Sequence, residues 1–205
     1  MEASVAEGIS WGALGPLLLL STALMASPGP TTVSLVGVAA AFGLRSAVPY
    51  MIGEIVGTFL VLVAVAMGVT AMLLAVPALA SVLVVIASGY ILWLAFRIAS
   101  APPLSQAAET KAPSLGGGLL LGIANPKAWV AIAALFASVR FTEAVTVDAA
   151  IKVIVLTVMI VVVHVGWLVA GAAVAAVLHN PRASRVVNVS MAVLLVAATG
   201  LALVR

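Results

Sequence analysis

A proline–glycine–proline sequence, Pro28-Gly29-Pro30, interrupts the first long apolar segment of the chain and strongly constrains its fold. A proline inside a helix removes a backbone hydrogen bond and clashes with the preceding turn, at a cost of about 3 kcal/mol. One continuous helix through this point is therefore not expected, although apolar residues continue on both sides. Within a bilayer, irregular backbone is tolerated only where protein buries it or a wet cavity solvates it. The interruption thus predicts either a cavity or a tightly packed kink.

The composition is that of a membrane protein. Hydrophobic residues make up 65% of the 205-residue chain and charged residues only 7%, against about half and about a quarter in globular domains. Helices that cross a bilayer need about 18 or more apolar residues, and charges this sparse leave room for several. No other segment is long enough to fold alone, so we expect a single transmembrane domain over residues 1–205.

Six apolar segments are expected to cross the membrane as helices, with no strands. They lie at residues 11–42, 48–74, 78–97, 116–139, 150–177 and 186–204. The first is about 32 residues long, or about 48 Å as a straight helix, against a hydrocarbon core of about 30 Å. That excess length agrees with a break or a steep tilt. The residues that precede it carry Glu2 and Glu7 instead of the positive charges of a secretory signal, so we expect a retained span.

The fourth predicted span is interrupted in the same way as the first, at Asn125-Pro126-Lys127. A linker rich in proline, alanine and serine, at 101–115, separates two halves, 1–100 and 116–205, with three spans each. Because three is odd, the second half must cross the membrane in the opposite sense. This is an inverted-repeat pattern, in which interrupted helices indicate a binding site near the midplane. The repeat rests on hydropathy and on the positions of the breaks, because the halves share no residue-level similarity.

The distribution of lysine and arginine predicts the orientation. Loops on the cytoplasmic side are enriched in these residues. Five of them fall on one side of the predicted topology, namely Arg45, Arg97, Lys111, Arg182 and Arg185, and three on the other, namely Arg140, Lys152 and Arg205. This bias places both termini on the outer side of the membrane.

Both breaks have the residues of a helix start. Asn125 is a preferred N-cap and Pro126 suits the first helical position, while Ser27 with Pro28, or Gly29 with Pro30, does the same in the first half. Two helix N-termini that meet near mid-depth would offer unpaired N–H groups and positive dipole ends to an anion such as a carboxylate. The alternative is a pair of kinks satisfied by neighbouring helices. The predicted substrate-binding residues are Pro28, Gly29, Pro30, Thr31, Thr32, Asn125, Pro126 and Lys127.

Two charged residues lie well away from the ends of the predicted spans. Lys127 lies at the second break, roughly 15–20 Å along the helix from Arg140, and an intramembrane charge is a candidate for a functional role. The alternative is a lysine whose long side chain extends to the membrane surface, so that its charge lies in water. Glu54 is the only acidic residue inside the six predicted spans. It could pair with Lys127, receive an ammonium group or exchange a proton, or it could face water in a cytoplasmic vestibule.

The remaining polar residues inside spans have simpler interpretations. His164, midway along the fifth span, is expected to hydrogen-bond a neighbouring carbonyl, with a proton relay as the alternative. Asn188 is expected to make a hydrogen bond between helices, with a clamp on a backbone segment as the alternative. The small residues Gly53 with Gly57, and Gly118 with Gly122, have the spacing that brings helix backbones together.

The residues at the breaks also resemble a known family, the LysE/RhtB amino-acid exporters. The matching segments are collinear and cover nearly the whole chain: Ser27-Pro28-Gly29-Pro30, Pro49-Tyr50-Met51-Ile52-Gly53 through Gly57, Gly89-Tyr90-Ile91-Leu92-Trp93-Leu94-Ala95, Asn125-Pro126-Lys127-Ala128-Trp129, and Asn188 to Met191. Two of them, Pro-Lys-Ala-Trp and Leu-Trp-Leu-Ala, are most similar to the cysteine/O-acetylserine exporter branch. The sequence departs from the family at Thr31, where asparagine is usual, and at Glu54, where apolar residues are usual.

The resemblance implies an antiporter that exports amino acids across a bacterial inner membrane and is driven by the proton motive force, with both termini periplasmic. The candidates for proton coupling, Glu54 and His164, come from the residues themselves and not from the resemblance. The expected partners are a small amino-acid substrate, the lipid bilayer and a second copy of the chain in a homodimer, and no nucleic acid. A passive channel and a non-transporting membrane scaffold are the competing interpretations.

Enzymatic chemistry is not expected. The chain has no cysteine, which excludes disulfides, thiolate metal sites and thiol redox chemistry. It also contains no nucleotide-binding loop and no catalytic triad, so no catalytic residue, metal site or cofactor is predicted.

Overall fold

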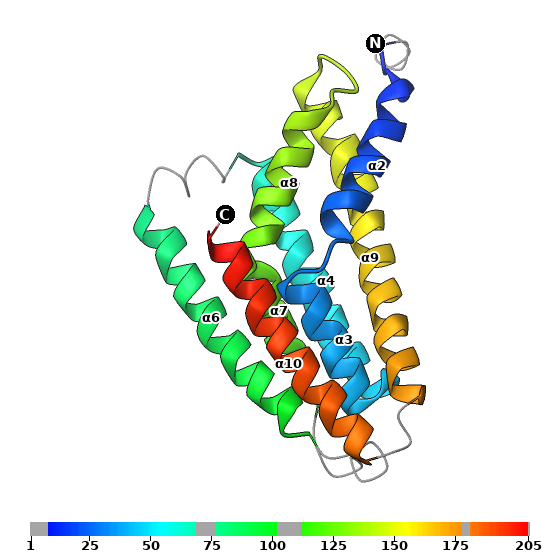
Figure 1. The fold of residues 1–205 in the computed structure, drawn as a ribbon. Coiled ribbons are helices and arrows are strands. Elements are labelled where there is room, and N and C mark those ends of the chain that lie inside the picture. Colours follow the sequence, from blue (N-terminus) through cyan, green and yellow to red (C-terminus); the bar gives the residue numbers. More distant parts are fainter. Residues whose placement is uncertain (1–7, 69–76, 102–111, 178–180, 205) are drawn as a thin grey trace.

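The chain forms a helical bundle in the computed structural model, which describes residues 8–68, 77–101, 112–177 and 181–204 (Figure 1). The described residues confirm the expected all-α class. The elements are η1 (Trp11–Ala13), α2 (Leu14–Met25), α3 (Pro30–Phe42), α4 (Leu44–Ala66), α6 (Pro77–Ala99), α7 (Leu115–Ala124), α8 (Pro126–Ser138), α9 (Val145–Val177) and α10 (Pro181–Val204).

Three helices are long and apolar enough to cross a bilayer by themselves, namely α4, α9 and α10. Two bent pairs are further candidates: η1 and α2 continue into α3 with a bend of 61°, and α7 continues into α8 with a bend of 55°. The described residues therefore contain up to five candidate spans, and α6 adds a shorter apolar stretch over Ser88–Ala99. The count of six spans stays a prediction.

Both breaks form where the sequence predicts them. Of the two possible starts in the first half, the chain uses the second: Gly29 is the extended N-cap residue and α3 begins at Pro30. The hydroxyl Oγ1 of Thr32 accepts a hydrogen bond from the Gly29 N–H at 2.8 Å, which satisfies one of the free donors of a helix start. At the second break, Asn125 Oδ1 accepts from the Lys127 N–H at 3.1 Å, which confirms the predicted N-cap.

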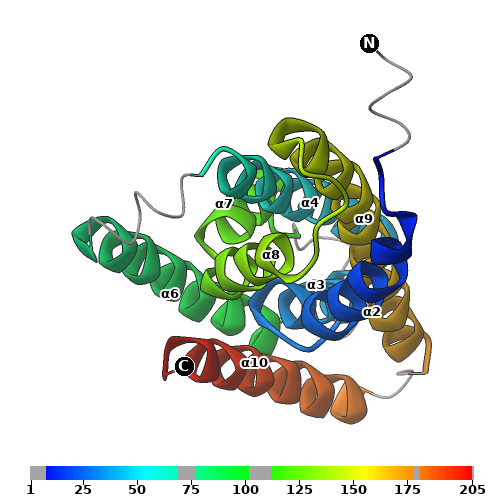
Figure 2. The same ribbon diagram turned by 90° about the horizontal axis from the view of Figure 1, so that it is seen from above.

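The two bent pairs run in opposite directions (Figure 1). The path from α2 to α3 leads away from the end that carries the N-terminus, whereas the path from α7 to α8 leads towards it. Opposite directions support the inverted repeat, which itself stays a prediction. Seen from above, α6 and α10 lie along one side of the bundle, and α3 lies inside it (Figure 2). All 13 residues of α3 are buried, as expected for a helix that is apolar all round.

Close backbone contact joins α4 to α7, as the glycine spacing predicts. A methyl group added to Gly122 would lie 2.7 Å from the carbonyl oxygen of Glu54 and 2.9 Å from the Cα of Gly57. Gly53 and Gly118 likewise face the backbone of the opposite helix, at Leu115 and Tyr50 respectively. Asn188 clamps backbone outside a helix instead of joining two helices, because its Nδ2 donates to the carbonyl of Ala101, beyond the end of α6, at 3.3 Å.

Several helices begin a few residues earlier in the chain than predicted. Gly43 turns the chain from α3 into α4 in one residue with φ of +82°, a left-handed conformation that favours glycine. Arg45 therefore lies in the first turn of α4 instead of a loop, and Arg182 and Arg185 lie in α10. Residues 69–74 of the second predicted span, most of the linker with Lys111, and Arg205 lie outside the described residues.

The fifth span contains an ion pair that the sequence reasoning missed. Helix α9 begins at Val145 instead of residue 150, so Glu54 is not the only acidic residue inside a span. Lys152, predicted to lie at the membrane surface, is only 3% exposed and pairs with Asp148 at 2.7 Å. Its Nζ also donates to the Phe136 carbonyl at 2.8 Å. Lys152 thus joins α9 to the end of α8. Because it is buried in a helix and not in a loop, it is not evidence for the orientation in the membrane.

Candidate functional site

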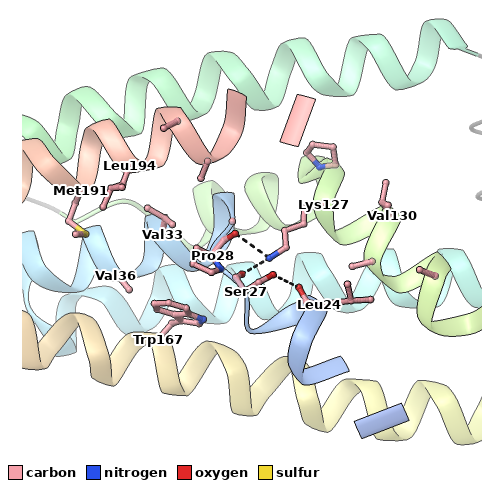
Figure 3. Close-up of a pocket in the computed structure, with 16 residues that line it drawn as sticks. Leu24, Ser27, Pro28, Val33, Val36, Lys127, Val130, Trp167, Met191 and Leu194 are labelled. Atoms are coloured by element: carbon pink, nitrogen blue, oxygen red, sulfur yellow. Dashed lines mark hydrogen bonds between the residues drawn. The ribbon is translucent and has the colours of Figure 1, made fainter. Parts of the chain in front are cut away.

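The two helix breaks touch each other. Asn125 Nδ2, at the second break, donates to Thr31 Oγ1, at the first, at 3.3 Å. Lys127 Nζ donates to the backbone carbonyls of Ser27 and Pro28, the second at 3.4 Å (Figure 3). Both contacts connect residues more than 90 positions apart in the chain. Packing between the two halves therefore brings the predicted site residues together.

A wide cavity of about 780 Å³ opens beside this contact (Figure 3). Pro28, Gly29, Pro126 and Lys127 of the predicted site line it. The rest of the wall is mostly apolar and comes from the end of α2 and from α3, α8, α9 and α10. Of the 16 lining residues, only Ser27 and Lys127 carry a hydroxyl or a charge. A cavity of this size falls in the range that holds small organic ligands, about 300–1,000 Å³.

A second, much smaller cavity of about 30 Å³ also has Lys127 in its lining. Its lining includes the predicted residues Thr31, Thr32, Asn125 and His164. A volume of this size is enough for a water molecule, because about 10–15 Å³ of probe-occupied volume already suffices. The two cavities share Lys127, Leu24 and Ala131 as walls.

One ring nitrogen of His164 is hydrogen-bonded, and the other has no partner in the described part of the chain. Its Nδ1 lies 2.8 Å from the carbonyl oxygen of Ile160, which confirms the predicted hydrogen bond. Since a carbonyl can only accept, Nδ1 carries the proton in the neutral ring and Nε2 is an acceptor. Nε2 is buried without a partner among the described residues, and so is Oγ1 of Thr58 in the same small cavity. These two atoms could hydrogen-bond a small polar molecule such as water.

Glu54 lies behind the site and lines neither cavity. It is fully buried, and its Oε1 accepts a hydrogen bond from Ser34 Oγ at 2.7 Å. Tyr50 donates to the same Ser34 hydroxyl at 3.3 Å. The structure describes no hydrogen bond between Glu54 and Lys127, and the alternative of a solvated side chain in a vestibule is wrong because α4 buries this face against α3 and α7. Glu54 Oε2 has no partner within the described residues.

Sequence reasoning missed four residues around the site. Ser34 and Thr58 lie one helical turn beyond Thr31 and Glu54, and that spacing could have indicated them. Trp167 and Met191 line the wide cavity from α9 and α10. Met191 ends one of the segments that carry the family resemblance, which could have indicated it, whereas nothing local in the sequence marks Trp167.

Comparison with known proteins places the site residues in a family model. A family model described as LysE type translocator matches residues 22–205, a range that includes both breaks and all of the residues around the two cavities. No curated protein and no solved structure matches the chain.

Proposed function

The chain belongs to the LysE type translocator family, and from this premise we propose that it is a secondary exporter of a small amino acid or a close amino-acid metabolite. The family consists of transporters, and the candidate spans make the chain a multi-pass membrane protein. The observation that carries the proposal is the contact between the two helix breaks beside the wide cavity. A transporter needs such a site, and a scaffold does not.

The substrate's carboxylate binds near the starts of α3 and α8. Each start carries part of a positive charge from the helix dipole, and Lys127 adds a full charge beside the cavity. Half-helix ends at the midplane hold charged groups of substrates in other transporters with inverted repeats. The substrate's side chain lies against the apolar wall, which includes Val33, Val36 and Trp167. This wall favours an apolar side chain, because a polar one would lose its hydrogen bonds with water.

Transport proceeds by alternating access, in which one half of the chain rocks against the other. Export is antiport coupled to protons across a bacterial inner membrane, with both termini periplasmic and the chain assembled as a homodimer. His164 and Glu54 are the candidates for carrying the proton. His164 faces the small cavity and Glu54 lies one helical turn from Thr58, so both are close to the breaks without lining the wide cavity.

The test is an efflux panel with the purified full-length protein in proteoliposomes. Vesicles are loaded with labelled cysteine, threonine, homoserine, leucine, lysine or arginine, and a proton gradient is imposed. Efflux of at least one of them, with protons moving in a fixed ratio, is expected. Substrate flux without proton flux would indicate a channel, and no flux across the panel would overturn the proposal. Strong flux of cysteine would support the cysteine/O-acetylserine branch, and leucine an apolar substrate.

A matched pair of variants controls the panel. Lys127→Met removes the charge beside the cavity and is expected to lower efflux at least tenfold, since a tenfold effect requires only about 1.4 kcal/mol. Arg140→Met removes a positive charge from the exposed segment just beyond α8 and is expected to leave efflux unchanged. Equal efflux from both variants would support the scaffold interpretation.

A further inference from the structure

The ammonium group of Lys127 lies on two backbone carbonyls at the first break. Ser27 and Pro28 fall in the gap between α2, which ends at Met25, and α3, which begins at Pro30. The carbonyls of these two residues belong to neither helix, so no N–H group of a helical ladder pairs with them. They are therefore a place for a cation, and Lys127 Nζ donates to both (Figure 3). No acidic side chain hydrogen-bonds to Lys127 in the part of the chain that the structure describes.

Gly29 makes room for this arrangement. A methyl group added at Gly29 would lie 2.6 Å from Cδ and 3.1 Å from Nζ of Lys127. Both are closer than ordinary van der Waals contact, so the lysine side chain lies directly across the glycine. Gly29 is extended with φ of −164°, a conformation open to any residue, so the fit of the lysine is a separate reason for glycine here. Glycine at this position lets the lysine side chain lie against the backbone of the break.

An α-amino acid also carries an ammonium group. On the basis of the proposed function, we propose that the Ser27 and Pro28 carbonyls are the subsite for the substrate's ammonium group, and that Lys127 occupies this subsite whenever substrate does not. Lys127 then supplies, from the protein itself, the ammonium group that the substrate supplies when it binds. It keeps the two carbonyls hydrogen-bonded and connects α8 to the end of α2 across the two breaks.

Substrate binding exchanges one ammonium group for another. The incoming ammonium takes the two carbonyls, and the released Lys127 Nζ pairs with the carboxylate of the same molecule. The charge of the site is unchanged at each stage, because a zwitterion brings one charge of each sign. The connection between the two breaks also persists, now through the substrate. This explains how a carrier with a site at its centre can return through the membrane without substrate.

The test separates the two ends of the substrate. Binding of 3-methylbutylamine, which has the ammonium but no carboxylate, is measured by calorimetry on the purified full-length protein in detergent. In wild type the amine must displace Lys127 without offering it a carboxylate. Lys127→Met removes this competitor, and the amine is expected to bind at least about tenfold more tightly if the lysine fills the subsite nine-tenths of the time. Lys127→Arg retains a competing cation and is expected to remain within about twofold of wild type.

A measurement on wild type alone guards against a variant that does not fold. Acetate offers the displaced lysine a carboxylate, so saturating acetate is expected to tighten 3-methylbutylamine binding, by the same factor with which the amine tightens acetate binding. Arg140→Met is expected to behave as wild type in both measurements. The inference is overturned if folded Lys127→Met binds the amine no more tightly than wild type, or if acetate leaves amine binding unchanged or weakens it.

These results are independent of the efflux panel. Amine binding that behaves as described while no amino acid is transported would support the ammonium subsite and overturn the exporter. Efflux that depends on Lys127 while the amine results fail would support the exporter and overturn the subsite.

Discussion

The contact between α4 and α7 provides the sharpest test of the packing. Gly122→Ala places a methyl group 2.7 Å from the Glu54 carbonyl oxygen and 2.9 Å from both the Gly57 Cα and the Thr58 nitrogen. Ordinary contact begins near 3.4 Å, so the two backbones must separate by about 0.7 Å. A gap of this size forfeits a quarter to a half of the attraction between the atoms on either side. In a bilayer, where water does not drive helices together, that attraction is a main source of association.

The expected cost is about 1–3 kcal/mol, the usual range for adding a methyl group to a filled contact. Replacing glycine by alanine also favours a helix by up to about 1 kcal/mol, which obscures the loss in a single variant. Gly166→Ala in α9 removes this ambiguity. Gly166 is also helical but has nothing within 4 Å of the added methyl group, so it gains the same helical preference without the clash. The difference between the two variants measures the clash alone.

The assay is reversible unfolding in mixed micelles, followed by helical circular dichroism as the fraction of denaturing detergent rises. Gly122→Ala is expected to be less stable than Gly166→Ala by about 1–3 kcal/mol. Adding Gly57→Ala to Gly122→Ala is expected to cost less than the sum of the two single changes, because one separation of the helices relieves both. If Gly122→Ala proves as stable as Gly166→Ala, the close approach of α4 and α7 is refuted.

Three further predictions address other contacts. Lys152→Met leaves the Asp148 carboxylate with the Phe141 N–H as a donor and takes the donor from the Phe136 carbonyl. It is therefore expected to cost about 1.5–3 kcal/mol of unfolding free energy, whereas Glu143→Gln, in an exposed pair, is expected to cost no more than about 1 kcal/mol; comparable losses in mixed micelles would contradict the burial of Lys152. Asn125→Leu removes a cap and a contact between the breaks and is expected to cost about 1–2 kcal/mol and to lower efflux, while Asn125→Asp, which keeps the cap, retains more of the stability. Glu54→Gln keeps the acceptor for its serine partner and is expected to preserve folding while reducing the protons moved per substrate, measured with a pH-sensitive dye; an unchanged ratio would transfer the coupling role to His164.

The sequence alone determined the class of the protein and the position of each break. Long apolar segments with few charges indicate helices that cross a membrane. In lipid every backbone N–H and C=O group must be hydrogen-bonded to protein, and a helix does this within its own segment. The break at Asn125-Pro126 was predictable, and the first break was narrowed to two neighbouring starts, because proline and the capping residues act within three or four positions. The close contact between α4 and α7 was predictable because residues four positions apart lie on the same face of a helix. Helix starts were less accurate, because polar and charged residues such as Arg45 lie in first turns.

Only the tertiary structure decided which groups meet. Lys127 reaches a carbonyl 100 positions away, and Asn125 reaches a hydroxyl 94 positions away, and no local pattern specifies contacts of such separation. Glu54 could have paired with Lys127 by sequence, but the packing of α3 against α4 gives it Ser34 instead. The buried position of Lys152 depends in the same way on the carbonyl of a different helix. Local preference fixes where a helix starts, whereas the partner of a buried polar group depends on which helix faces it, and that is settled only when the whole bundle packs.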